Sequence, residues 1–178
     1  MADLLECLVQ IRALKETSRR LEALLARFPF PLWRERALEG RWTPSEVVAH
    51  LADCELFYGT RLRLMLTVDR PLLQPLDQDR LAARAGYADW PPLLALSRFR
   101  TRREEVLELL EGCGAEDLNR VGIHPVRGEM TVADLVALML AHDTDHLGQI
   151  AERLELTASK PGSGVRGPGC GADQGDEE

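Results

Sequence analysis

Apolar residues recur mainly at three- and four-residue steps along the chain, which is the spacing of one face of an α-helix. Leucine and isoleucine follow this spacing over residues 3–27, and Pro29 and Pro31 then end the pattern because proline cannot continue a helix. Thr43 and Thr131 each precede an acidic residue by three positions, as helix-capping residues do. Similar amphipathic stretches cover residues 43–66, 89–111 and 131–154. The pattern therefore predicts an all-α protein built as a four-helix bundle.

Two connections between these helices are long and lack helical periodicity. Residues 69–88 contain two prolines and several acids, and we expect a long crossover loop with a short helical turn. Residues 115–130 form the second irregular connection. The segment from Pro161 onward holds six glycines and few apolar residues, so we expect it to be disordered. The expected organisation is a bundle domain over residues 1–157 and a glycine-rich acidic tail over residues 158–178.

The charge of the chain argues against nucleic acid and membranes as partners. The net charge is −7, and the tail from Pro161 contributes −3, which leaves −4 for the predicted bundle. An acidic domain without a basic cluster suits neither nucleic acid nor an anionic membrane surface, so a small-molecule substrate is the expected partner. The four cysteines are widely spaced and the N-terminal residues do not form a secretory signal, which favours a reduced, cytoplasmic location.

Two of the four histidines, His142 and His146, lie four residues apart in the last predicted helix. They project from one helix face, which is the spacing a helix uses to give two imidazoles to one metal ion. Apolar residues share that face, so both rings should point into the bundle. The alternative interpretation is that they are hydrogen-bonded core histidines without a metal ion. His50, inside the second predicted helix, can meet them in an antiparallel bundle. Three imidazoles leave one coordination position open, so this set predicts a catalytic site for a divalent metal ion.

Three polar residues near these histidines have different expected roles. Asp53 lies three residues after His50, on nearly the same helix face, and could orient an imidazole, accept a proton or bind the metal. Gln149, almost one turn after His146, could line the pocket or hydrogen-bond a bound water. Asp143 is expected to be a plain solvated charge.

Cys54 and His124 are further candidates. Cys54 lies four residues after His50, so the two form a possible alternative ligand set. A small buried hydrophobe is the commoner role of a free cysteine, and we place Cys54 outside the predicted ligands. His124 lies in a loop and could reach the mouth of the pocket as a general base, although a structural role is the commoner one.

Four short motifs, in order, resemble those of the DinB/YfiT-like superfamily of metal-dependent enzymes, which is distinct from the DNA polymerase that shares the name. Trp42-Thr43-Pro44, followed by His50-Leu51-Ala52-Asp53-Cys54-Glu55, resembles the family's second-helix motif. The segment from His142 to Ile150, with its His-x-x-x-His pair and Gln149, resembles the fourth-helix motif. Residues 75–79 and 122–131 look like family loops. The resemblance covers about residues 1–154.

The resemblance implies an up-down-down-up bundle, often a homodimer, with zinc or nickel on three histidines that correspond to His50, His142 and His146. Members include transferases of low-molecular-weight thiols such as bacillithiol and a mycothiol-dependent isomerase. The sequence departs from the family at Cys54, where small residues are usual.

These observations lead to two function hypotheses. In the first, the protein is an enzyme whose ion lowers the pKa of a thiol cofactor for a transferase reaction, or uses a bound water to hydrolyse an amide or ester. Asp53 or His124 would take the proton. In the second, the protein is a non-catalytic metal-binding bundle that acts in stress response, and the ion braces two helices.

Overall fold

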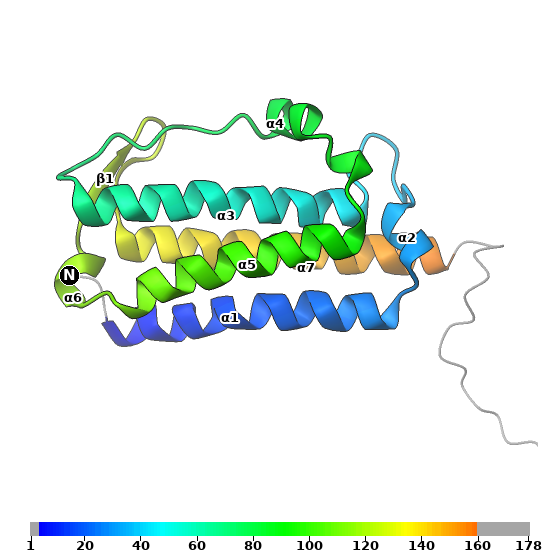
Figure 1. Ribbon diagram of the computed structural model, residues 1–178, viewed down its shortest axis with the longest axis horizontal. Coiled ribbons are helices and arrows are strands. Elements are labelled where there is room, and N and C mark those ends of the chain that lie inside the picture. The colour runs from blue at the N-terminus through cyan, green and yellow to red at the C-terminus, as the bar shows by residue number, and fades with distance from the viewer. Residues whose placement is uncertain (1–3, 160–178) are drawn as a thin grey trace, which may run out of the picture.

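Four long helices lie side by side and confirm the predicted bundle (Figure 1). The computed structural model describes residues 4–159, and the tail predicted for residues 158–178 lies almost wholly outside the described residues. The long helices are α1 (Leu4–Arg27), α3 (Pro44–Thr67), α5 (Pro92–Glu111) and α7 (Val132–Ala158). The predicted and observed bounds agree closely, except that α7 extends past the predicted end at residue 154.

The helices α1 and α7 run in one direction and α3 and α5 in the other, which is the up-down-down-up order (Figure 1). Each of α1 and α7 packs against its parallel partner and one antiparallel neighbour. Because α3 and α5 are parallel, the chain must return along the whole bundle between them. The crossover segment, residues 68–91, makes this return and contains the helix α4 (Gln78–Ala85) and the 3₁₀ turn η1 (Tyr87–Asp89).

Capping boxes fix where α3 and α7 begin. Thr43 Oγ1 accepts from the Glu46 backbone nitrogen at 3.2 Å, and Glu46 Oε2 accepts from the Thr43 backbone nitrogen at 2.6 Å. Thr131 and Asp134 make the same reciprocal pair at 3.1 and 2.7 Å. Each box satisfies backbone donors that the first helical turn leaves unpaired, so both predicted helix starts are confirmed.

The prediction of an irregular connection over residues 115–130 is wrong. This segment forms the short helix α6 (Ala115–Leu118) and an antiparallel hairpin of β1 (Val121–His124) and β2 (Gly128–Thr131). Strands of four residues are too short to show a clear alternation of apolar and polar positions. A further short helix that the sequence pattern did not predict, α2 (Phe30–Arg34), follows α1.

The hairpin is tied to the crossover segment. The Leu73 backbone nitrogen donates to the Ile123 carbonyl and the Ile123 nitrogen donates to the Pro71 carbonyl, both at 2.8 Å. Gly122 permits this approach, because a Cβ atom there would lie 2.9 Å from Leu73 Cδ1. The two segments together cover one end of α3 and α7 (Figure 1).

The bundle interior holds two apolar clusters separated by polar residues. One cluster surrounds Leu62, Val106 and Leu135, and the other surrounds Val48, Phe99 and Ile150. On α3, α5 and α7, the positions between the clusters carry buried charged or imidazole side chains. Within residues 4–159, none of the helices is long and apolar enough to cross a membrane.

Candidate metal centre

The rings of His50, His142 and His146 meet between α3 and α7. His142 Nε2 lies 3.1 Å from His50 Nε2 and 3.1 Å from His146 Nε2, and the ring centroids of His50 and His146 are 4.8 Å apart. The side chain of His50 is fully buried, and the other two are partly buried. The structure therefore brings together the three imidazoles that the sequence singled out.

Gln149 determines which ring nitrogen of His146 carries the proton. Gln149 Oε1 lies 3.2 Å from His146 Nδ1 and 3.3 Å from Arg153 Nη2. An arginine nitrogen can only donate, so the amide atom between the two groups is the oxygen, and His146 Nδ1 donates to it. In the neutral ring, Nε2 of His146 then holds a lone pair that faces the other imidazoles. Such a contact to the distal nitrogen is typical of a metal-binding histidine.

The three Nε2 atoms cannot all satisfy one another by hydrogen bonds. A neutral imidazole nitrogen is either a donor or an acceptor, so a single proton on His142 Nε2 would have to serve both His50 and His146. Nδ1 of His142 is buried and has no hydrogen-bond partner within the described part of the chain, so no contact imposes the other tautomer. A cation among the three rings would accept all three lone pairs. Nitrogens bound to one zinc ion are about 3.3 Å apart, close to the distances found here.

Burial keeps these imidazoles neutral. Burial, followed by the charges of His146 and His142, lowers the pKa of His50 to about 3. Burial, followed by the charge of His146, lowers the pKa of His142 to about 4, and burial also lowers the pKa of His146. The rings are thus uncharged near pH 7 in the ion-free protein, which is the state that binds metal ions.

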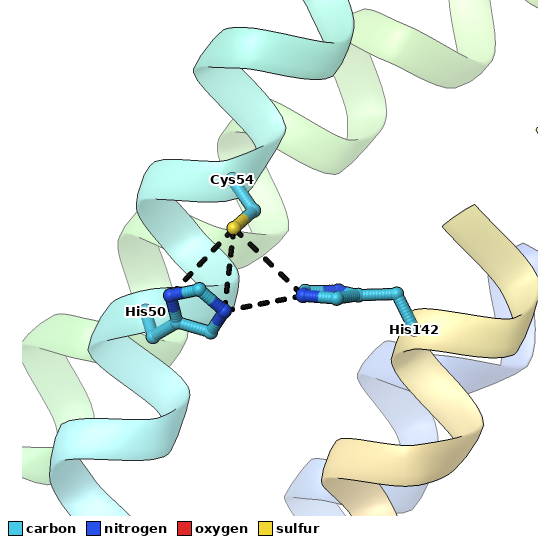
Figure 2. A group of neighbouring side chains, drawn as sticks. All are labelled: His50, Cys54 and His142. Atoms are coloured by element: carbon cyan, nitrogen blue, oxygen red, sulfur yellow. Dashed lines mark hydrogen bonds between the residues drawn. The ribbon is translucent and has the colours of Figure 1, made fainter. Parts of the chain in front are cut away.

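Cys54 joins the histidine cluster, although the sequence analysis weighed it as an alternative ligand and placed it outside the predicted set. Its Sγ lies 3.4 Å from His50 Nε2 and 3.9 Å from His142 Nε2 (Figure 2). The ligand atoms of His50, Cys54 and His142 all lie within 4.8 Å of one another, so these three side chains could hold a metal ion. The signal in the sequence was the four-residue spacing from His50, which places both side chains on one face of α3.

Asp53 and His124 lie in different surroundings. Asp53 accepts from Tyr87 Oη at 3.1 Å and from Arg102 Nη1 at 2.6 Å, so one hydroxyl and one guanidinium already occupy its two oxygens. His124 lines the cavity beside His142, and its Nδ1 accepts from the backbone nitrogens of Val126 and Arg127 at 3.2 Å. The catalytic roles expected of Asp53 and His124 stay predictions.

A buried ion network lies between the two apolar clusters. Arg103 of α5 pairs with Glu55 of α3 at 2.7 Å and with Asp143 of α7 at 2.7 Å, and it donates to the Leu14 carbonyl of α1 at 3.0 Å. Thr17 of α1 adds a 2.6 Å hydrogen bond to Asp143. All four long helices therefore meet at this network, which uses all five guanidinium donors.

The interpretation of Asp143 as a solvated charge is wrong, because its side chain is 1% exposed. It occupies a core position of α7 and pairs with Arg103. Burial opposes the charge of Arg103, but the attraction and hydrogen bonds of Glu55 and Asp143 raise its pKa above the ordinary arginine value. Sequence spacing carried the signal, since Met139, Asp143 and Leu147 follow one another at four-residue steps.

A cavity of about 360 Å³ opens onto the histidine cluster. Its walls come from α3, the crossover segment, the hairpin and α7, and His142 and Cys54 form part of its lining. This volume lies within the range of small-molecule sites. An exogenous ligand can therefore reach the centre, which distinguishes it from a sealed structural metal site.

The fold and the site together define a class of protein: a four-helix bundle with a candidate metal site beside a cavity. The family model described as the DinB superfamily matches residues 13–150. The chain therefore belongs to the DinB superfamily, which confirms the resemblance carried by the sequence motifs.

Several proteins of similar sequence carry the name of a metal-dependent hydrolase. "Putative metal-dependent hydrolase OB0413" of Oceanobacillus iheyensis is 30% identical over 112 residues, which cover 63% of this chain and 64% of that protein. A Bacillus pumilus protein with the same general name is 30% identical over 122 residues, covering 65% of this chain and 66% of that protein. The chain thus aligns with just under two thirds of the length of these relatives.

Solved structures show the same fold. YfiT from Bacillus subtilis, described as a probable metal-dependent hydrolase with an unusual four-helix bundle topology, superposes with a TM-score of 0.80 at 21% identity, covering 87% of this chain and 89% of that chain. A mycothiol-dependent maleylpyruvate isomerase superposes with a TM-score of 0.65 at 13% identity, covering 89% of this chain and 71% of that chain. At these identities the likeness concerns the fold.

Proposed function

We propose that this chain is a metal-dependent enzyme that acts on a carbonyl substrate with water or with a low-molecular-weight thiol as the nucleophile. His50, His142 and His146 would hold the ion, and zinc and nickel suit such imidazole ligands. The observation that carries the proposal is a cluster of three neutral imidazoles, whose Nε2 atoms lie 3.1 Å apart in two pairs, beside a cavity that one of them, His142, lines. The hydrolase names of the family relatives support the reaction with water.

Each side chain then has a definite task. The bound ion would acidify a water or a thiol and polarise a carbonyl group. Gln149 holds His146 in the tautomer that leaves Nε2 free. His124 lines the cavity and its Nδ1 is already an acceptor, so the neutral ring carries its proton on Nε2 and would be a candidate donor to a leaving group.

Metal analysis tests the ligand set. The purified protein should retain one equivalent of zinc or nickel after growth in supplemented medium, measured by inductively coupled plasma mass spectrometry. His50→Ala and His142→Ala should lose the ion, because each removes a central ligand. His124→Ala is the matched control, since it removes a histidine that is outside the cluster, and it should keep the ion. Equal metal content in wild type and both cluster variants would refute the site.

Turnover separates the enzyme from a non-catalytic bundle. The metal-loaded protein should hydrolyse members of a panel of small esters and amides, or transfer a thiol to an electrophile, and the rate should fall to background in His142→Ala. A protein that binds its ion tightly but leaves the whole panel unchanged would instead support the non-catalytic metal-binding bundle. In that case the ion braces α3 and α7.

A further inference from the structure

The cavity beside the histidine cluster contains two arginines without acidic partners. Arg61 of α3 and Arg127 of the hairpin turn both line it. No ion pair within 4 Å involves either side chain among the described residues, whereas Arg102 and Arg103 are each paired with buried carboxylates. No aspartate or glutamate of the described chain lines the cavity. Within residues 4–159, no carboxylate in the cavity lining or within ion-pair distance therefore balances these two positive charges.

Arg61 is held in place but not satisfied. Its Nη2 donates to the Gln74 carbonyl at 2.6 Å, which fixes the guanidinium against the crossover segment. Its Nε is buried and lacks a hydrogen-bond partner within residues 4–159. Burial of a charged group without an opposite charge is costly, so a carboxylate beside this guanidinium would offset part of that cost. Arg127 lies close enough for its charge to act on Arg61.

His124 adds a further hydrogen-bond donor to the cavity lining. The backbone nitrogen of Arg127 donates to His124 Nδ1, which leaves the Nε2 proton of the neutral His124 ring for a ligand. Two arginines and one histidine with a free N–H thus line a single cavity, together with His142 and Cys54. Arginine forks suit a carboxylate particularly well, because two parallel N–H bonds match its two oxygens.

We propose that this cavity is the binding site for the carboxylate of a small organic acid, with Arg61 and Arg127 as the residues that select it. The inference rests on the proposed function, since the other end of the same molecule reaches the metal centre at His142. It adds a substrate class to that function: a molecule that carries both a metal-reactive group and a carboxylate. The cavity volume of about 360 Å³ limits the substrate to a small molecule.

Calorimetric titration with two thiols of equal size tests the proposal. The thiol group is a zinc ligand in both probes, and 3-mercaptopropionate carries a carboxylate where 3-mercaptopropionamide carries a neutral amide. With zinc-loaded wild type, the acid should bind about tenfold or more tightly than the amide, as for a charge-assisted arginine–carboxylate contact. Arg61→Gln and Arg127→Gln should each reduce this preference to about twofold or less. Arg63→Gln is the matched control, because Arg63 is an exposed α3 residue that faces Glu105, and it should keep the preference.

The variants also guard against unfolding. Arg61 holds the crossover segment, so its substitution could disturb the fold, whereas the guanidinium of Arg127 has no ion-pair partner among the described residues. Equal affinity of wild type for both probes, binding of neither probe, or an undiminished preference in Arg127→Gln would overturn the carboxylate site. Failure of the proposed function has a different signature. In that case the affinities for both thiols are the same with and without zinc, whatever the carboxylate contributes.

Discussion

Cys54 is expected to complete the metal centre as a thiolate, and proton release on metal binding measures this directly. Its Sγ lies 3.4 Å from His50 Nε2 and 3.9 Å from His142 Nε2. A sulfur and a nitrogen bound to the same zinc ion are about 3.6 Å apart in a tetrahedral arrangement, so the sulfur is within reach of an ion that the two histidines hold. With Cys54 as the fourth ligand, a water or thiol from the cavity would have to bind as a fifth ligand or displace Cys54.

The protonation states of the ion-free protein set the size of the effect. Burial, followed by the charges of Glu55 and Asp53, raises the pKa of Cys54 to about 12, so its thiol is protonated near pH 6. The pKa values of His50 and His142, lowered to about 3 and about 4, leave both rings without a proton to release. Zinc binding should therefore release a proton from Cys54 and none from His50 or His142. The apparent zinc affinity should rise about tenfold per pH unit around pH 6.

Isothermal titration calorimetry in buffers of different ionisation enthalpy counts the released protons. About pH 6 is the suitable condition, because a zinc-bound water with a pKa of about 7 still keeps most of its proton there. Wild type should release one proton more than Cys54→Ser, whose hydroxyl stays protonated. Cys113→Ser, a half-buried cysteine outside the cluster, should behave as wild type. Equal proton release in wild type and Cys54→Ser would refute thiolate coordination and leave the imidazoles as the ligands.

Three further predictions follow from the packing and the protonation states. Arg103→Met should reduce the free energy of unfolding by about 3–5 kcal/mol in urea titrations, because it leaves two buried carboxylates without their cation. Arg63→Met, which removes an exposed ion pair, should reduce it by less than about 1 kcal/mol. Between pH 7 and 5, the ion-free wild type should lose about 2 kcal/mol more unfolding free energy than His50→Leu. The lowered pKa of His50 means that only the unfolded state takes up a proton as the pH falls below about 6.5. Equal losses in the two proteins would contradict a neutral buried ring. Gln149→Ala should weaken zinc binding by about 10- to 100-fold in competition titrations, because it removes the contact to the His146 ring. Glu152→Ala, on the exposed face, should leave zinc binding unchanged. Unchanged binding in both variants would mean that the contact does not orient His146.

Helical periodicity was sufficient to predict the bundle and the shared helix face of His142 and His146. The helices are long, their apolar stripes are regular, and capping residues mark two of the starts, so each local signal agrees with the fold. His142 and His146 share a face by spacing alone. The position of His50 against these two rings depends on how α3 packs against α7. Spacing alone does not give this packing, and the resemblance to a known family supported it.

The parts that the sequence did not reveal depend on contacts between distant segments. The hairpin of residues 121–131 is stabilised by its pairing with Pro71 and Leu73 of the crossover segment, and four-residue strands carry little periodicity of their own. The cavity arises from the same contacts, because the hairpin brings His124 and Arg127 to a space that α3 and α7 leave open. No local pattern predicts such a cavity.

The buried charges were visible in principle. On α5, Phe99, Arg103, Val106 and Leu110 follow at three- and four-residue steps, and Glu55 and Asp143 occupy equivalent positions on their own apolar stripes. A single charged residue on a stripe has many explanations. One cation and two anions on the stripes of three helices indicate a buried ion network, because unpaired charges in those places would destabilise the fold.

The buried ion network lies directly next to the candidate metal centre. Glu55 directly follows Cys54 on α3, and Asp143 directly follows His142 on α7, so each helix carries an ion-pair residue beside a candidate ligand. Apolar stripes tolerate small shifts of one helix along another, but the paired contacts of Arg103 with both carboxylates do not. A displacement of α3 relative to α7 would break these contacts and separate His50 from His142 together. We infer that the network contributes to the helix register that the candidate centre requires, because apolar residues alone could supply comparable stability.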